Sequence, residues 1–192
     1  GTSPLFIQTL LEQGYDVQTF PSATLQNPPF DRIIFGEVPH LRTETQGATP
    51  FDRDTRLTAD FLQYLDQKPD KPFFAFLFYD LLHAISIPAP HRHKFEPSWE
   101  YANYMALNNE MDATPFFNLY RNCGWYVDSL VGSIVGELEH KGLLDNSILV
   151  ITGDHSQEFN ENKKNYWGHG SNYSDAQIHV PFIYYVPGQA PR

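Results

Sequence analysis

The sequence predicts an α/β domain in which a mostly parallel sheet has helices on both faces. Residues 73–79 form a continuous apolar and aromatic run after two prolines, which is typical of a strand buried on both faces. Residues 115–141 repeat apolar side chains at three- and four-residue steps, which predicts a long helix. Helical and strand patterns alternate along the chain, and this alternation favours parallel strands joined by helical crossovers.

The other expected elements are shorter. Apolar periodicity predicts two further helices, at residues 5–13 and 54–65. The first of them should end at Gly14, because glycine commonly follows the last helical residue. Apolar runs predict three further strands, at residues 15–20, 147–152 and 180–186. Segments rich in proline or polar residues predict loops, at residues 22–47, 83–97 and 155–179.

Composition limits the class of protein. The 192 residues are 41% apolar and include fifteen phenylalanines, so residues 1–192 can form one domain with a sizeable core. The formal net charge is −10, and no basic stripe is present to neutralise phosphates, so no nucleic-acid partner is expected. Cys123 is the single cysteine, which excludes an internal disulfide. No apolar stretch approaches the roughly 20 residues of a membrane span.

The residues that carry chemistry follow the strand at 147–152. Asp154 and His155 come directly after Gly153, at the carboxyl end of an apolar strand, where α/β folds keep their ligands. Carboxylate and imidazole together suit a divalent cation. The sequence therefore predicts Asp154 and His155 as metal ligands. The alternative is that the aspartate caps the next segment and the histidine hydrogen-bonds to it.

Two further histidines are candidates for the same site. His169 lies between two glycines, which would let the backbone approach a ligand closely; it could bind metal, donate to a phosphate or sulfate oxygen, or be a surface turn residue. His83 follows the strand at 73–79 and should emerge at the same sheet edge as Asp154 if the strands are parallel. There it could bind substrate or act as a general acid, or it could be an ordinary loop histidine.

Weaker candidates surround these residues. Glu158 and Glu161 either orient a histidine or, more simply, belong to a solvated face. His91 and His93 form a His-x-His pair, which solvent exposure explains more simply than metal binding. No sequence pattern typical of a nucleophilic serine, a P-loop or a dinucleotide site is present.

Several short motifs in combination resemble a known superfamily. Gly153-Asp154-His155, then Gly168-His169-Gly170, then Val180-Pro181-Phe182-Ile183 resemble the C-terminal half of the alkaline phosphatase/sulfatase superfamily. Residues 78–83, 103–109 and 158–170 more closely resemble the periplasmic domains of YejM/PbgA-type inner-membrane proteins. That family is related to lipoteichoic acid synthase and to phosphoethanolamine transferases.

The resemblance implies an N-terminally truncated sulfatase-like fold with a divalent metal ion (Mg, Mn, Ca or Zn). It implies that Asp154 and His155 are metal ligands, that His83 is a substrate-side histidine and that His169 is the second histidine of the active site. The nucleophilic threonine and its acidic partner would precede Gly1, so the fragment would be inactive. Ser156 stands where the superfamily usually has glycine after the Asp-His pair, which puts full metal affinity in doubt.

The resemblance also implies a biological setting. The chain would belong to the periplasmic face of the bacterial inner membrane, in a membrane-anchored protein involved in lipopolysaccharide and outer-membrane lipid homeostasis. Its partners would be a phospholipid or lipopolysaccharide-related ligand and an inner-membrane regulatory protein. Two functions follow from it: a metal-dependent phosphoryl hydrolase or transferase, or a non-catalytic sensing or scaffold module with a vestigial metal pocket.

Overall fold

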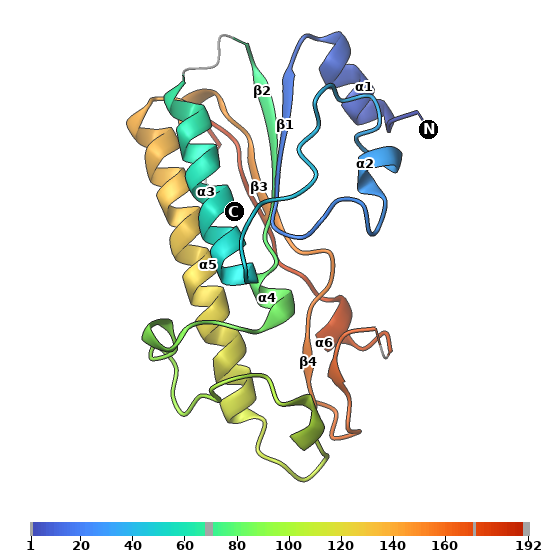
Figure 1. The fold of residues 1–192 in the computed structure, drawn as a ribbon, viewed down its shortest axis with the longest axis vertical. Helices are drawn as coiled ribbons and strands as arrows, with labels where there is room; N and C mark the ends of the chain where they lie inside the picture. Colours follow the sequence, from blue (N-terminus) through green and yellow to red (C-terminus); the bar gives the residue numbers. More distant parts are fainter. Residues whose placement is uncertain (1, 68–70, 171, 190–192) are drawn as a thin grey trace.

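A computed structural model describes residues 2–67, 71–170 and 172–189. Its first sheet pairs β1 (Asp16–Pro21) with β2 (Phe73–Phe78) in parallel, from Asp16 opposite Phe73 to Pro21 opposite Phe78. Helices lie on both faces of this sheet (Figure 1). On one side are α1 (Leu5–Glu12) and α2 (Phe30–Ile33), and on the other are α3 (Pro50–Asp66) and α5 (Thr114–His140).

The alternation of side chains along β2 builds a separate core on each face. Phe73, Ala75 and Leu77 pack with Leu57, Phe61 and Ile134 of α3 and α5. The intervening residues, Phe74, Phe76 and Phe78, pack with Ile7, Val17 and Phe35 on the opposite face. Because successive side chains of a strand point to opposite faces, a strand that is apolar at every position needs a core on both sides. The predicted two-sided packing of residues 73–79 is therefore confirmed.

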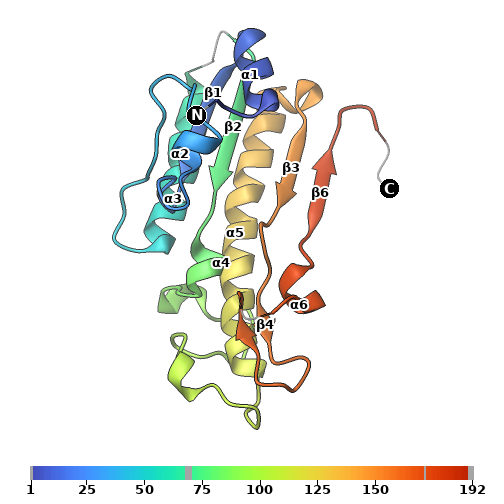
Figure 2. The same cartoon turned by 90° about the vertical axis from the view of Figure 1, so that its right-hand side faces the viewer.

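The prediction of a mostly parallel sheet is not confirmed in the described part of the chain. The second pair, β3 (Leu149–Thr152) and β6 (Phe182–Tyr185), is antiparallel. Among the described residues between β3 and β6, the one helix is the four-residue α6 (Asp175–Ile178), whereas the crossover that joins parallel strands is usually a longer helix. Figure 2 shows β2 and β3 running in the same direction along α5, although no described ladder joins them.

The expected loop at residues 155–179 contains a short antiparallel hairpin. Its strands are β4 (Glu158–Phe159) and β5 (Trp167–Gly168). The turn between them uses Asn160, Lys163 and Asn165 at positive φ, a conformation that asparagine tolerates better than most residues. The remaining short helices are α4 (Leu81–Ala84), η1 (Ala89–His91), η2 (Tyr104–Ala106) and η3 (Leu144–Asn146).

Helix α3 begins four residues before the predicted start at residue 54. Asp52 N donates to Thr49 Oγ1 at 3.2 Å, and Thr49 N donates to Asp52 Oδ2 at 3.1 Å. This reciprocal capping box, with Pro50 at the first helical position, extends the helix over residues that lack apolar periodicity. The long helix predicted at 115–141 is confirmed as α5. Within the described residues, no helix combines the length and apolar character needed to cross a membrane.

Candidate metal centre

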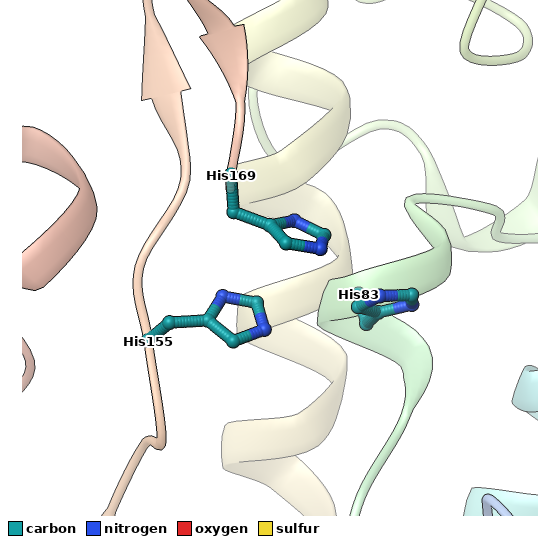
Figure 3. Close-up of side chains that lie close together, drawn as sticks. All are labelled: His83, His155 and His169. Atoms are coloured by element: carbon teal, nitrogen blue, oxygen red, sulfur yellow. The ribbon is translucent and has the colours of Figure 1, made fainter. Parts of the chain in front are cut away.

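Three histidines converge where β2 and β3 terminate, partway along the length of α5 (Figure 1). His83 lies on α4 directly after β2, His155 lies three residues after β3, and His169 follows β5. One ring nitrogen from each lies within 4.8 Å of the other two. The ring centroids are 4.1 Å apart for His155 and His169, and 4.9 Å apart for His83 and His169. Figure 3 shows the three rings directed toward one another from three separate segments.

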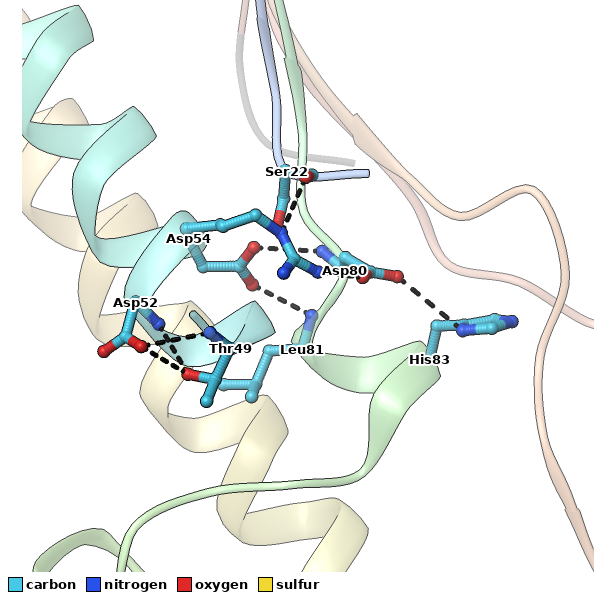
Figure 4. A network of polar contacts seen from close by, with 8 residues as sticks. Ser22, Thr49, Asp52, Asp54, Asp80, Leu81 and His83 are labelled. Atoms are coloured by element: carbon cyan, nitrogen blue, oxygen red, sulfur yellow. Dashed lines mark hydrogen bonds and ion pairs between the residues drawn. The ribbon is translucent and has the colours of Figure 1, made fainter. Parts of the chain in front are cut away.

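The position of His83 depends on a buried carboxylate of α3. Asp54 is fully buried, and its two oxygens accept hydrogen bonds from the backbone N–H of Asp80 at 3.1 Å and of Leu81 at 2.9 Å (Figure 4). Those groups would otherwise lack partners at the start of α4. Asp54 therefore fixes the first turn of the helix that carries His83, just after β2 ends.

The carboxylate of Asp80 lies between the guanidinium group of Arg53 and the imidazole ring of His83. Asp80 Oδ2 pairs with Arg53 Nη2 at 3.0 Å, and Asp80 Oδ1 lies 3.6 Å from Nδ1 of His83. Arg53 is itself held because its Nε donates to the carbonyl of Ser22 at 2.8 Å, at the end of β1. The carboxyl ends of β1 and β2 thus meet at one network, which orients His83 toward the other two histidines.

His155 is positioned by the turn that follows β3. Asp154 Oδ1 accepts the backbone N–H of His155 at 3.1 Å, and the N–H of Ser156 donates to the carbonyl of Gln177 at 2.9 Å. A Cβ at Gly153 would lie 3.3 Å from the backbone oxygen of His155 and 3.6 Å from Val180. The turn is therefore tight enough to favour glycine at 153.

The glycines around His169 allow a turn that most residues could not make. Gly168 and Gly170 have φ values of +80° and +78°, in the left-handed region where other side chains are strained. The two glycines therefore allow the chain to turn on both sides of His169, whose ring lies at the cluster. Their predicted role in close approach of the backbone to a ligand stays a prediction.

Each ring directs Nδ1 to an oxygen atom. His155 Nδ1 lies 3.1 Å from the carbonyl of Ser156, and His169 Nδ1 lies 3.1 Å from Oε1 of Gln157. Carbonyl and amide oxygens only accept hydrogen bonds, so the ring nitrogen must donate. The neutral rings then carry their lone pair on Nε2. A histidine that binds metal almost always donates its other N–H in this way, so the three side chains fit a cation.

The electrostatics of the cluster favour neutral imidazole at His169. Partial burial lowers the pKa of His169 below its usual value, and the neighbouring His155 and His83 lower this pKa further because three positive charges would repel. Asp154 acts in the opposite direction. Metal binding requires the unprotonated ring. The crowding of three imidazoles therefore keeps His169 in the form that a cation needs.

Asp154 is less closely engaged than the sequence predicted. Its side chain is 69% exposed, and Oδ1 lies 3.9 Å from Nε2 of His155. The close cluster consists of the three histidines, with the carboxylate beside it. Imidazole-rich sites suit zinc and other borderline divalent metals better than magnesium or calcium, which prefer oxygen. The assignment of Asp154 and His155 as ligands, and of His83 and His169 as catalytic residues, stays a prediction.

The expectation of a solvated face at Glu158 is wrong, because this side chain is fully buried. Its carboxylate accepts hydrogen bonds from four side chains, which pin the segment carrying His169: Asn162, Asn172, Ser174 and Gln177. These bonds lower the pKa of Glu158. Sequence analysis named Glu158 but favoured a solvated face for it, and it missed Gln157. The available signal was the pair of aromatic residues, Phe159 and Trp167, that flank an asparagine-rich turn typical of a hairpin.

The His-x-His pair lies apart from the cluster. His91 packs between Phe51 and Tyr126, with both centroid distances 5.0 Å. The exposed ring of His93 lies 3.5 Å from a carboxylate oxygen of Glu96. Among the described residues, the cluster at His83, His155 and His169 is the one group of three or more ligand-type side chains close enough to share an ion.

The sulfatase family model matches residues 2–192. Iduronate 2-sulfatase from Homo sapiens is 36% identical over 64 residues, which are 33% of this chain and 11% of that protein. Among solved structures, the soluble domain of lipooligosaccharide phosphoethanolamine transferase A from Neisseria meningitidis has a TM-score of 0.68 at 19% identity, covering 95% of this chain and 54% of that one. The C-terminal periplasmic domain of EcEptC from Escherichia coli, in a complex with Zn, has a TM-score of 0.69 at 18% identity and covers 97% and 53%.

These likenesses support the superfamily fold that the motifs predicted. The chain spans about half the length of the two solved structures and about a tenth of the human sulfatase. At identities below 20%, the structural likeness shows the fold and not the substrate. The closer resemblance to YejM/PbgA-type proteins stays a prediction.

Proposed function

The chain belongs to the sulfatase family, and on that premise we propose that its histidine cluster binds a divalent cation that serves phosphoryl transfer or hydrolysis. The observation that carries the proposal is the convergence of His83, His155 and His169, whose ring nitrogens lie within 4.8 Å of one another. The solved Zn complex of a protein with the same fold makes zinc the first ion to test.

Each side chain has a role in this proposal. A bound cation would supply Lewis-acid stabilisation of the negative charge that develops on a phosphoryl oxygen. His155 and His169 would hold the cation through Nε2, and Asp154 would balance its charge. His83 is exposed, and because its Nδ1 faces Asp80, its Nε2 is suited to hold a phosphoryl oxygen or to move a proton there. Asp80 would keep that ring in orientation.

We further propose the setting that the motif resemblance implies. The chain would be part of a periplasmic domain of an inner-membrane protein, acting in lipopolysaccharide and outer-membrane lipid homeostasis. A phospholipid or lipopolysaccharide-related molecule would be its ligand, and a second inner-membrane protein its regulatory partner. Two relatives in fold are described as a lipooligosaccharide phosphoethanolamine transferase and a periplasmic domain, and they support this setting.

A non-catalytic module with a vestigial pocket is the second candidate. In the described residues, the polar contacts of the three histidines involve carboxylates, a backbone carbonyl, an amide and the rings themselves, with no hydroxyl or thiol among them. Cys123 is fully buried in the core, and burial raises the pKa of its thiol to about 12, so it cannot act as a nucleophile. A nucleophile would have to come from another segment, and without one the site would only sense or bind.

Direct metal binding tests the proposal. The chain is titrated calorimetrically with Zn²⁺, Mn²⁺, Mg²⁺ and Ca²⁺ in turn, and one equivalent of Zn²⁺ is expected to bind. His155→Ala should abolish this binding. His140→Ala is the matched control, because that ring is exposed at the end of α5 beside Glu137. Equal Zn²⁺ binding by the wild-type and His155→Ala chains would overturn the metal centre.

Activity separates the two candidate functions. In the intact protein that carries this domain, hydrolysis of 4-nitrophenyl phosphate and of 4-nitrophenyl sulfate is measured with and without Zn²⁺. Zn²⁺-dependent phosphate hydrolysis that is lost in His155→Ala supports the enzyme. Tight Zn²⁺ binding without turnover of either ester supports the non-catalytic module.

A further inference from the structure

Gln157 lies directly across the β4–β5 hairpin from His169. Glu158 is opposite Gly168, and Phe159 is opposite Trp167. The same antiparallel register, continued by one residue, places Gln157 opposite His169. Side chains directly opposite each other in such a ladder have Cβ atoms about 5 Å apart and interact. The Gln157 side chain is buried, with 8% of its surface exposed, and its Oε1 lies 3.1 Å from His169 Nδ1.

We propose that Gln157 is a positioning residue that keeps His169 in the tautomer protonated on Nδ1 and so presents the Nε2 lone pair to the cation. This inference rests on the proposed metal centre, because it assigns Gln157 a role at that site. The amide oxygen cannot donate, so the contact exists only when Nδ1 carries the hydrogen. With Oε1 facing the ring, the tautomer with the hydrogen on Nε2 would leave two acceptors facing each other.

The neighbouring residue fixes the segment that carries the amide. Glu158 follows Gln157 on the same strand, so the two side chains point to opposite sides. Glu158 is fully buried and accepts four side-chain hydrogen bonds, which anchor the strand from the side away from His169. Gln157 thus lies on a segment that is held in place, and its side chain is itself buried.

The three ring contacts differ in how they can be tested. The partner of His155 is a backbone carbonyl, which no substitution at Ser156 removes. The partner of His83 is a carboxylate at 3.6 Å, which also pairs with Arg53. Gln157 is a neutral side chain bonded to one ring, so replacing it changes the tautomer of His169 and leaves the other two rings with their partners. His155 then serves as an internal control in the same sample.

The experiment compares Gln157→Leu, which removes the acceptor, with Gln157→Glu, which keeps one. Imidazole ¹⁵N shifts of the metal-free chain at pH 8 report the tautomer of each ring, and Zn²⁺ titration against a competing chelator reports affinity. In Gln157→Leu we expect His169 to shift toward the Nε2–H tautomer while His155 stays unchanged. Zn²⁺ should bind roughly ten- to a hundredfold more weakly, which is the usual effect of losing such a partner. Gln157→Glu should restore both readouts.

Two controls keep the outcomes distinct. Asn162→Ala removes one donor to Glu158 without touching Gln157, so it should leave the His169 tautomer as in the wild type. Gln157→Met replaces Gln157→Leu if the latter does not fold. An unchanged His169 tautomer in Gln157→Leu or Gln157→Met would overturn the positioning role, whatever the Zn²⁺ affinity. A changed tautomer in a chain that binds no Zn²⁺ in any form would support the positioning role and overturn the metal centre instead.

Discussion

The buried carboxylate of Asp54 makes a specific contribution to stability that depends on pH. Asp54 lies under the start of α4 and holds the backbone N–H groups of Asp80 and Leu81. Burial raises the pKa of this carboxyl from 3.8 to about 6, against the opposing effect of these hydrogen bonds. The perturbation that tests this is Asp54→Asn, which removes the titration and keeps the size of the side chain.

The sign and size follow from linkage. The folded pKa is higher than the unfolded one, so between these values the folded chain binds the proton more tightly. The resulting stabilisation is complete below pH 3.8 and is lost as the pH rises through about 6. A shift of about 2 units corresponds to about 3 kcal/mol, of which about 2 kcal/mol falls between pH 4.5 and pH 8. The Asp54→Asn variant lacks this pH-dependent stabilisation. Its imperfect hydrogen bonds change the free energy of unfolding by an amount that does not depend on pH.

The assay is urea unfolding of both chains at pH 4.5 and pH 8. The free energy of unfolding of wild type minus that of Asp54→Asn should fall by about 2 kcal/mol between the lower and the higher pH. Histidines and other carboxyls titrate in both chains, so the subtraction removes them. Asp128→Asn is the matched control, because Asp128 is exposed on α5 and should show no such difference. A wild-type-minus-variant difference that does not change with pH would refute the reasoning.

Two further predictions concern the segments around the site. Glu158→Gln should lower the free energy of unfolding, measured by urea titration, by about 2–4 kcal/mol. The reason is that the amide NH₂ must then face one of the four donors in a fully buried site. A change below about 0.5 kcal/mol would show that the donors reorganise freely. Thr49→Ala should cost about 1 kcal/mol by loss of the capping box of α3. Its Zn²⁺ affinity should equal that of the wild type, and a weaker affinity would show that the helix start also shapes the site.

Much of the secondary structure was predictable because each element has a local signature. The apolar run of β2 and the periodic face of α5 required no knowledge of their partners. The same holds for the glycine at 153, where a tight turn follows β3. Two wrong predictions also have local causes. Helix α3 starts before residue 54 because Thr49 and Asp52 cap it, and a cap cannot be recognised from apolar periodicity. The hairpin was missed because its strands have only two residues each.

The sequence by itself determined the chemical types at the site, namely three histidines and an aspartate placed after strands or between glycines. The sequence also led us to expect that these residues share one site, and the three rings do lie within ligand distance of one another. The tertiary structure alone decided that Asp154 stands beside the three rings and not among them. It also decided that Glu158 is buried and that Gln157 faces His169. The reason is that local sequence patterns determine the secondary structure of a segment. The partner of a polar side chain, in contrast, depends on residues brought together from distant parts of the chain.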